Sequence, residues 1–296
     1  MPELPEVETV RLGLKSLIVG KTIKSATHDW AKSFPNDPEQ VDIFLIGSRV
    51  EAVKRRAKVL IIELSSGYSL VIHLKMTGQL VFKSQDQRFG AGHPNESLIG
   101  NLPDKSTRVV IGFSDDSNLY FNDQRKFGWM RLIKTSDILT IDLIRTLGPE
   151  PLAASFSWQV LKDRLNIRPN SAIKAVLLDQ KVIAGIGNIY ADESLWGAKI
   201  HPLTTVKSLT DKDIKLLHTA LIDVLKLSIK KGGSTDRNYV NAEGKKGSYI
   251  QFAKVFRREG LPCPRCGHEI LKIRAAGRGT HYCPYDQRLK VAKIPK

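Results

Sequence analysis

Residues 2–18 read PELPEVETVRLGLKSLI, and this stretch decides how the fold begins. Pro5 suits the first position of a helix, where its missing N–H group is not needed. Glu6 and Glu8 follow at the positive end of the helix dipole, and apolar residues then recur at helical spacing as far as Gly20. The stretch therefore predicts an amino-terminal helix.

The sequence that follows this helix is typical of short strands separated by polar turns. Residues 59–64 and 69–74 are predicted to pair as a hairpin across a Ser-Ser-Gly turn, and 108–113 to pair with 118–121. Several short strands of this kind favour a β-sandwich or a barrel. Residues 83–106 are rich in Gly, Pro, Asn and Asp, and they predict a long surface loop.

The second half of the chain has a helical pattern. It follows a candidate linker, Gly-Pro-Glu-Pro, at residues 148–151. Three helices are predicted, over 171–180, 188–197 and 211–230. Asn170 or Ser171 is expected to cap the first of them and Thr210 the last. Residues 233–250 are polar, contain glycine and are rich in lysine, so they predict a mobile loop.

The charge of the 296-residue chain favours a polyanionic partner. Lys and Arg number 46 against 30 Asp and Glu, which gives a formal net charge of +16. Nucleic acid is the commonest such partner, because each phosphate contact releases counterions; a merely soluble basic protein is the alternative. No stretch is apolar enough to span a membrane, and the acidic amino terminus does not resemble a signal peptide, so a cytoplasmic protein is expected.

Three cysteines in the carboxy-terminal part of the chain point to a metal rather than to disulfides. Cys263 and Cys266 form a C-x2-C pair and Cys283 follows after sixteen residues, as in two knuckles that share one zinc ion. Asp286 stands where a fourth thiol is expected, and carboxylate oxygen is a legitimate zinc ligand. Two other candidate ligands lie nearby, His268 and His281. A zinc site and a degenerate finger held by packing are both compatible with this pattern.

Pro2 is a candidate nucleophile. The initiator methionine is normally removed before a small second residue, so Pro2 is expected to carry the free α-amino group, which titrates near 7.7–8.0. A secondary amine can attack a sugar C1′ atom to give an iminium, and such nucleophiles need a nearby acid or base. Glu3 is adjacent and Glu6 lies one helical turn away, although two glutamates at a helix start can equally be dipole complements.

The stretch IAGIGNIY at residues 183–190, between two predicted helices, is a candidate phosphate site. Gly185 and Gly187 permit a tight turn, and Asn188 would begin the second helix, whose N–H groups face any anion there. A simple packing joint between two helices is the alternative. No strand precedes the glycines, so the stretch is not a dinucleotide fingerprint.

Five motifs together carry a resemblance to a known family. In chain order they are MPELPEVETV at 1–10, HLKMTG at 73–78, DQRKFG at 123–128, the Gly185–Ala191 turn and the terminal cysteine hairpin. With these motifs the sequence closely resembles bacterial formamidopyrimidine-DNA glycosylases over nearly its whole length. The amino-terminal string is highly specific, because the sister endonuclease VIII group typically has glycine where this chain has Leu4.

The resemblance implies a multidomain α+β fold. Its parts would be a catalytic β-sandwich with flanking helices at residues 1–147, a helix–two-turn–helix DNA-binding domain at 152–250, and a zinc-finger-like β-hairpin at 251–296. Loop 233–250 would cover the flipped base. The implied partner is double-stranded DNA that contains oxidised bases, bound by a monomer with one structural Zn²⁺ per chain and no membrane.

The resemblance also implies a set of catalytic residues. Pro2 would be the nucleophile, and Glu3 would protonate the sugar oxygen and later shuttle protons. Glu6 would support the site. Lys58 would be the essential lysine near the phosphate.

Six further residues match DNA-contacting positions of the family: His73, Asn188 and Arg278 at phosphates, and Met76, Arg125 and Phe127 inside the duplex. A target base must leave the stack before its glycosidic bond can be reached. An apolar side chain such as Phe127 can fill the gap, and Arg125 offers a fork of donors to the orphaned cytosine. Without the resemblance, Met76 and Phe127 are more typical of core residues, and Lys58 and Arg125 of solvated charges.

The chain departs from the family's pattern at several positions. Asp286 replaces the usual fourth cysteine, Lys75 stands where glycine is common, and Gln124 and Lys126 replace the usual Pro and Arg around Arg125. We expect a bifunctional glycosylase and AP lyase that removes 8-oxoguanine and formamidopyrimidines. An endonuclease VIII-like enzyme for oxidised pyrimidines and a non-catalytic protein that binds damaged DNA are the alternatives.

Overall fold

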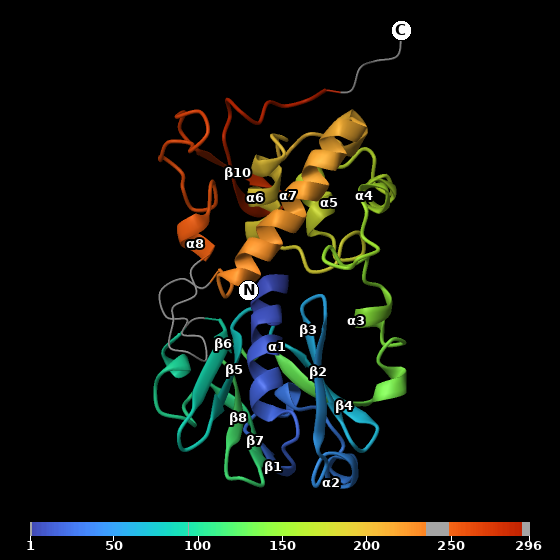
Figure 1. Cartoon of the computed structure of the whole chain (residues 1–296), viewed down its shortest axis with the longest axis vertical. Helices are drawn as coiled ribbons and strands as arrows, with labels where there is room; N and C mark the ends of the chain where they lie inside the picture. Colours follow the sequence, from blue (N-terminus) through green and yellow to red (C-terminus); the bar gives the residue numbers. More distant parts are fainter. Residues whose placement is uncertain (1, 94, 235–248, 292–296) are drawn as a thin grey trace. The chain divides into compact units, whose positions relative to one another are not determined.

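The structure, a computed structural model, describes residues 2–93, 95–234 and 249–291 (Figure 1). The chain divides into two compact units, each with a hydrophobic core of its own. The first unit comprises Met1–Arg145 and Ile229–Tyr249, and the second comprises Thr146–Ser228 and Ile250–Lys296.

The first unit is a β-sandwich of two antiparallel sheets. One sheet has five strands in the order β1-β7-β8-β5-β6, and the other has four in the order β2-β3-β4-β9. The strands of the first sheet are β1 Ile23–His28, β5 Gly78–Lys83, β6 Arg88–Gly92, β7 Thr107–Phe113 and β8 Asn118–Asp123. Those of the second are β2 Val50–Arg56, β3 Val59–Leu64, β4 Tyr68–His73 and β9 Trp129–Lys134. The unit also holds the helices α1 Leu4–Ile18, α2 Pro38–Phe44 and α3 Asp142–Arg145.

The predicted amino-terminal helix and both predicted hairpins are confirmed. Helix α1 starts at Leu4, so Pro5 is its second residue rather than its first. Strands β3 and β4 pair with Leu60 opposite Ile72, and β7 and β8 pair with Ile111 opposite Leu119. These elements were predictable because each carries its own periodic apolar pattern.

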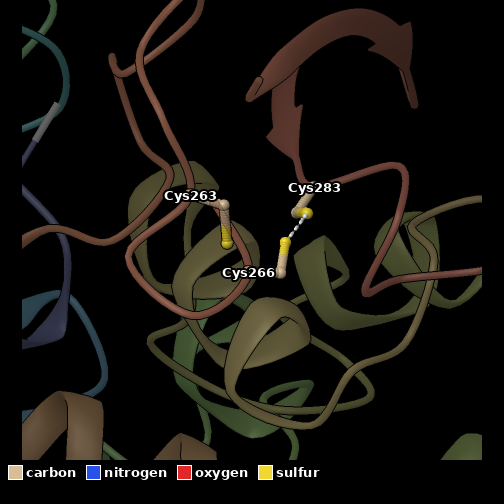
Figure 2. Close-up of side chains that lie close together, drawn as sticks. All are labelled: Cys263, Cys266 and Cys283. Carbon is tan, nitrogen blue, oxygen red and sulfur yellow. Dashed lines mark hydrogen bonds between the residues drawn. The ribbon is translucent and has the colours of Figure 1, made fainter. Parts of the chain in front are cut away.

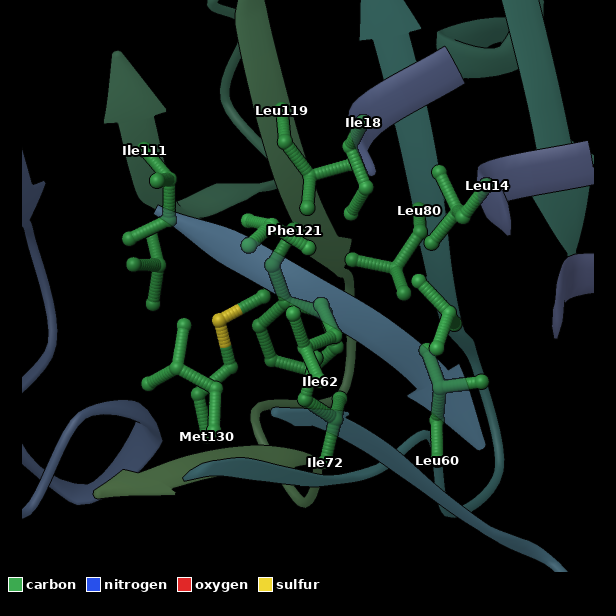
Figure 3. Close-up of a cluster of buried hydrophobic side chains, with 14 of the residues drawn as sticks. Leu14, Ile18, Leu60, Ile62, Ile72, Leu80, Ile111, Leu119, Phe121 and Met130 are labelled. Atoms are coloured by element: carbon green, nitrogen blue, oxygen red, sulfur yellow. The ribbon is translucent and has the colours of Figure 1, made fainter. Parts of the chain in front are cut away.

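The core of the sandwich is built by α1 and both sheets (Figure 3). Ile18 comes from α1, Leu80 from β5 of the five-stranded sheet and Ile62 from β3 of the four-stranded sheet, and all three are buried. Strand β3 is apolar on both faces because a second cluster covers its outer side, where Ile61 packs near Ile138. Burial on two faces explains why the residues of β3 form a continuous apolar run instead of alternating.

The prediction of a surface loop at 83–106 is wrong. Residues 88–92 form β6, which pairs with β5, and the Phe89 ring lies against Gly13 of α1. Leu98 packs on the outer side of the same sheet, and the Arg88 guanidinium donates to three backbone carbonyls in this segment. The strand was missed because RFGAG is short and holds two glycines, which hides the strand pattern.

The second unit is mainly helical. Its helices are α4 Trp158–Leu165, α5 Ile173–Leu178, α6 Asn188–Gly197, α7 Asp211–Lys230 and α8 Tyr249–Phe252, the last two of which cross the boundary between units. A hairpin of β10 Leu271–Ala275 and β11 Arg278–Tyr282 completes it. None of the helices that the structure describes has the length and apolar composition needed to cross a bilayer.

Of the two helix caps predicted in the second unit, the one at Thr210 is confirmed and the one at Asn170 or Ser171 is wrong. Thr210 and Asp213 cap α7 reciprocally, since Asp213 Oδ2 accepts from Thr210 N at 2.9 Å and Thr210 Oγ1 accepts from Asp213 N at 3.3 Å. Neither Asn170 nor Ser171 caps α5. That helix begins at Ile173, whose N–H donates to the Thr204 carbonyl at 2.8 Å, so tertiary structure replaces the side-chain cap.

Candidate active site and DNA-contacting surfaces

The amino-terminal end of α1 is held by a reciprocal cap. Glu6 Oε2 accepts a hydrogen bond from Glu3 N at 2.7 Å, and the Glu3 side chain faces the backbone N–H of Glu6. Pro2 and both glutamates are buried. The cap keeps the Glu3 carboxylate beside Pro2. A group that exchanges protons during attack by an amine has to lie within reach of that amine.

The second oxygen of Glu6 holds the chain at residues 233–234. Glu6 Oε1 accepts from Ser234 N at 2.7 Å, and Gly233 adopts a φ of +90° against the Glu6 side chain. Glu6 thus connects the start of α1 to the residue at which the predicted base-covering loop begins. Most of that loop, 235–248, lies outside the described residues.

Lys58 lies in the tight turn between β2 and β3 and is buried. The preceding residue, Ala57, has a φ of +52°, and its carbonyl accepts from Arg55 Nη1 at 2.8 Å. Arg55 Nε in turn donates to Glu8 Oε2 at 2.9 Å. A glutamate of α1 therefore supports the turn that presents Lys58. No local pattern predicts this link, because Glu8 and Arg55 are 47 positions apart.

Two arginines, Arg11 and Arg55, keep the Glu8 carboxyl ionised. Burial raises the pKa of this carboxyl, but hydrogen bonds from Arg11 and Arg55 outweigh burial and place the pKa below its usual value. Arg11 Nη2 lies 2.6 Å from Glu8 Oε1. The anion that supports the Lys58 turn therefore persists throughout the neutral range.

His73, at the end of β4, is brought next to the Lys58 turn, because Val59 pairs with His73 across the hairpin. Its Nδ1 accepts from Lys75 N at 3.0 Å, which leaves Nε2 to carry the proton. Burial, and after it the charges of Lys75 and Lys58, lower the pKa of His73 from 6.5 to about 3. His73 is therefore a neutral N–H donor at physiological pH, which suits a contact with a phosphate oxygen.

This pKa predicts an acid-sensitive contribution to stability. The pKa of His73 is near 6.5 in the unfolded chain but about 3 in the folded protein. Its contribution to the free energy of unfolding is therefore complete above pH 6.5 and is lost as the pH falls toward 3. In denaturant titrations at pH 7 and pH 5, His73→Gln should lose less stability on acidification than the unaltered protein. The exposed His28→Gln should behave like the unaltered protein. Equal losses in the unaltered and His73→Gln proteins would contradict the assignment.

A buried aspartate organises the turn that carries Arg125 and Phe127. Asp123 Oδ2 accepts from Phe127 N at 2.8 Å and from Gly128 N at 2.7 Å, and Oδ1 accepts from Arg125 N at 3.1 Å. The Thr77 hydroxyl also donates to Asp123 Oδ1, which ties this turn to the one that holds Met76. Asp123 was missed by sequence reasoning, although an aspartate that opens a glycine-containing turn is a recognisable signal.

Arg125 and Phe127 project from this turn into solvent. Phe127 is 54% exposed, and the Arg125 guanidinium lies 5.0 Å from the centroid of its ring. Met76 is half-buried in the neighbouring turn, where Lys75 has a φ of +50°. An exposed phenylalanine on a rigid turn is not a core residue, so the structure favours a surface role over the core alternative for Phe127.

In the second unit, Asn188 is the first residue of α6 and lies beside the β10–β11 hairpin. Its Nδ2 donates to the Gly279 carbonyl at 3.0 Å. Gly185, with a φ of +89°, makes the preceding turn possible, and its N–H donates to Gln180 Oε1 at 2.9 Å. The structure therefore places Asn188 next to Arg278, which is exposed at the tip of the hairpin.

The contact between α6 and the hairpin rests on buried charges. Lys174 and Asp192 form a fully buried ion pair, and Asp192 Oδ2 accepts from His281 N at 3.0 Å. Glu193 Oε1 accepts from Val255 N at 2.9 Å and from Phe256 N at 2.8 Å. These residues were not predicted, because their role depends on segments far apart in the sequence.

Arg278→Ala should weaken binding to duplex DNA of every sequence alike. A phosphate contact releases a counterion, so the slope of log K against log salt should become shallower by roughly one unit. Fluorescence anisotropy over a salt series measures both quantities. Arg145→Ala, which removes an exposed arginine outside the predicted contacts, is the control. An unchanged slope with Arg278→Ala would contradict the assignment.

Three thiols meet at the base of the hairpin (Figure 2). The sulfurs of Cys263, Cys266 and Cys283 all lie within 4.8 Å of one another, and those of Cys266 and Cys283 are 3.3 Å apart. The Trp196 indole N–H donates to Cys263 Sγ at 3.4 Å. Burial raises the pKa of Cys263, but this bond and two backbone N–H groups outweigh it and lower the pKa to about 7. Three converging thiols fit a zinc site.

Asp286 does not join the thiols, contrary to its predicted role as the fourth ligand. Its carboxylate is ion-paired with Arg265 instead. His268 stacks on Tyr285, and His281 lies against Asp192. Among the described residues, the group that could hold a metal ion therefore consists of the three thiols. The spacing of the motif predicts a fourth ligand at position 286, but it does not determine the direction of the Asp286 side chain.

Family profiles match three consecutive parts of the chain. Residues 1–130 match the formamidopyrimidine-DNA glycosylase N-terminal domain, and residues 147–239 match the H2TH domain of the same enzyme. Residues 260–288 match a zinc finger found in FPG and IleRS. The third match covers the three thiols described above.

Full-length relatives agree with these profiles. A formamidopyrimidine-DNA glycosylase of Lactiplantibacillus plantarum is 41% identical over 98% of this chain and 100% of its own length. One from Chloroflexus aurantiacus is 42% identical over 97% of this chain and 98% of its own. A mutant glycosylase of Lactococcus lactis, solved with Fapy-dG-containing DNA, has a TM-score of 0.84 at 38% identity and covers 97% of this chain and 100% of its own.

A β-sandwich with a capped amino-terminal helix, an H2TH segment and a thiol-bearing hairpin together define a DNA glycosylase. Within that class, the chain belongs to the formamidopyrimidine-DNA glycosylase family. The wild-type L. lactis enzyme has also been solved with DNA that contains an oxidised pyrimidine, at a TM-score of 0.83, 37% identity and coverage of 97% of this chain and 100% of that one.

Proposed function

We propose that this chain excises 8-oxoguanine and formamidopyrimidines from duplex DNA and then cuts the strand, with the Pro2 amine as nucleophile. The observation that carries the proposal is the buried, reciprocally capped amino terminus, where Pro2 directly precedes Glu3. A helix cap alone does not need a proline amine at its edge. The names and DNA lesions of the relatives support the substrate class.

The neutral Pro2 nitrogen bonds to C1′ as the glycosidic bond breaks. The base departs with the proton that the Pro2 nitrogen loses after the attack. Glu3 then protonates O4′, the sugar ring opens and an iminium links the protein to the sugar. The iminium acidifies the neighbouring C–H bonds, so the 3′ phosphate and then the 5′ phosphate leave by elimination. Water hydrolyses the last iminium, which releases the sugar remnant as an aldehyde and restores the free amine.

The cationic and polar residues hold the phosphates during these steps. Lys58 and the neutral Nε2–H of His73 lie together at the start of β3 and end of β4, and they are assigned to phosphates near the target nucleotide. Asn188 and Arg278, which lie together in the other unit, are assigned to further phosphates. Glu6 positions the amino terminus and residue 234.

Three side chains would replace the extruded base. Phe127 is exposed on a turn whose backbone is fixed by Asp123, so it can enter a base step with little loss of freedom. Arg125 would donate to the orphaned cytosine and Met76 would fill the space left by the base. The thiols would hold one structural zinc per chain, which takes no part in these steps.

Borohydride trapping on a panel of lesion duplexes tests the proposal. The reductant converts the iminium into a stable covalent adduct, so 8-oxoguanine opposite cytosine should give a protein–DNA band and strand cleavage. A second candidate, excision of oxidised pyrimidines, is favoured by the L. lactis complex with such a lesion. Trapping on oxidised pyrimidines but not on 8-oxoguanine would select it. Tight binding without an adduct on any duplex would show a non-catalytic DNA-binding protein.

A further inference from the structure

The two knuckles of the thiol-bearing hairpin are built alike. One reads Cys263-Pro-Arg-Cys266 and the other Cys283-Pro-Tyr-Asp286. In each, the backbone N–H groups of the third and fourth residues donate to the sulfur of the first cysteine. Asp286 therefore stands where the second knuckle would supply a ligand, as Cys266 does in the first.

The Asp286 side chain nevertheless faces cations. It is ion-paired with Arg265, and its other oxygen lies 3.6 Å from Lys199 Nζ. The Arg265 guanidinium stacks 3.8 Å above the Trp196 ring and donates from Nη2 to the Trp196 carbonyl at 3.1 Å. We call Asp286, Arg265 and Trp196 the hairpin clamp, because they fasten the second knuckle to the first and to the end of α6.

Two physical effects keep the carboxylate in the clamp. The side chains of Asp286 and Arg265 are only 10% and 26% exposed, so removal of the anion would leave a largely buried guanidinium without its partner. Three thiolates already exceed the charge of Zn²⁺ by one. A fourth anion at the metal would raise that excess in a site of low dielectric, whereas beside Arg265 the same anion is neutralised.

We propose that this chain holds zinc with three thiolates and an exogenous fourth ligand, while Asp286 serves as the anion of the hairpin clamp. Three protein ligands and one open position are the arrangement in which small molecules reach zinc. The site should therefore accept a monodentate ligand such as imidazole, and it should release its metal faster than a four-thiolate site. This inference does not depend on the glycosylase activity.

Cobalt(II) in place of zinc in the full-length protein gives a direct readout, because its visible absorption bands report the ligand set. Imidazole should produce a saturable change in the spectrum of the unaltered protein as it enters the fourth position. Asp286→Cys supplies a fourth thiolate, so its spectrum should not respond to imidazole. An unaltered protein whose spectrum is indifferent to imidazole would overturn the proposal, and this arm needs no variant to fold.

Zinc affinity, measured by competition with a chromophoric chelator, tests Asp286 itself. Loss of a direct ligand should cost more than the roughly tenfold that even outer partners of a metal site contribute. Cys283→Ser should show such a loss. Asp286→Asn, which keeps the shape but removes the charge, should cost no more than the roughly tenfold expected of an outer partner. A loss with Asp286→Asn as large as that with Cys283→Ser would overturn the proposal.

A double-mutant cycle tests the clamp at saturating zinc. Arg265→Gln and Asp286→Asn should each lower the unfolding temperature, and the double variant should lose little more than the worse single variant, because each change removes the same contact. Losses that simply add would show that the two side chains act independently and would overturn the clamp.

Discussion

Replacement of Pro2 by glycine should reduce base excision and strand cleavage by roughly 10³-fold or more, the scale on which enzymes lose rate when their nucleophile is disabled. Glycine leaves a primary amine on a freely rotating residue, in place of a secondary amine fixed by a ring. Single-turnover cleavage of an 8-oxoguanine duplex measures the effect. Binding to the same duplex should be retained, because Pro2 is assigned to chemistry rather than to phosphate contacts.

Pro5→Ala is the matched control for this variant. Pro5 is buried in the first turn of the same helix but cannot carry the terminal amine. Its replacement should alter stability and leave the single-turnover rate within a few-fold of the unaltered protein. If Pro2→Gly cleaves and traps as well as Pro5→Ala, the amine mechanism is wrong.

Replacement of Glu3 by glutamine should reduce excision by about 10²- to 10⁴-fold, the range that a positioned general acid contributes. Glutamine keeps the size and an accepting oxygen for the helix cap but cannot give a proton to the sugar. If Glu3 were only a cap, the substitution would cost about 1 kcal/mol of stability or less and leave the rate unchanged. Single-turnover rates and thermal unfolding of the same preparation separate the two roles.

Glu39→Gln is the corresponding control, because Glu39 lies in the first turn of α2 and is exposed. It should change neither rate nor lesion affinity. A Glu3→Gln protein with normal excision would assign Glu3 to helix capping alone and would require another proton donor.

Elements with a strong local pattern were predictable from sequence. Helix α1, the β3–β4 hairpin and helix α7 carry regular apolar spacing that needs no knowledge of the rest of the chain. Strand β6 lacks such spacing, since it owes its place to pairing with β5 and to the fit of Phe89 against Gly13. Tertiary contacts, rather than local propensity, determine whether such segments form strands.

In the candidate site, too, the residues that share a local motif were predictable and those that depend on tertiary contacts were not. The amino-terminal motif placed Pro2, Glu3 and Glu6 together because they share one helix start. The residues that support the site were not predictable. Glu8 acts on the Lys58 turn through Arg55 of β2, and Asp123 fixes the Phe127 turn because it accepts from backbone N–H groups. A spacing rule fixes positions along the chain but not the direction of a side chain, as Asp286 illustrates.

Peptide mapping of the reduced covalent complex examines most directly whether the amino terminus performs the chemistry. The protein is trapped with borohydride on an 8-oxoguanine duplex, digested with protease and nuclease, and sequenced by mass spectrometry. We predict that the sugar remnant is bonded to the nitrogen of Pro2 in a peptide that lacks the initiator methionine. A remnant on the side chain of a lysine such as Lys58, with Pro2 unmodified, would contradict the account.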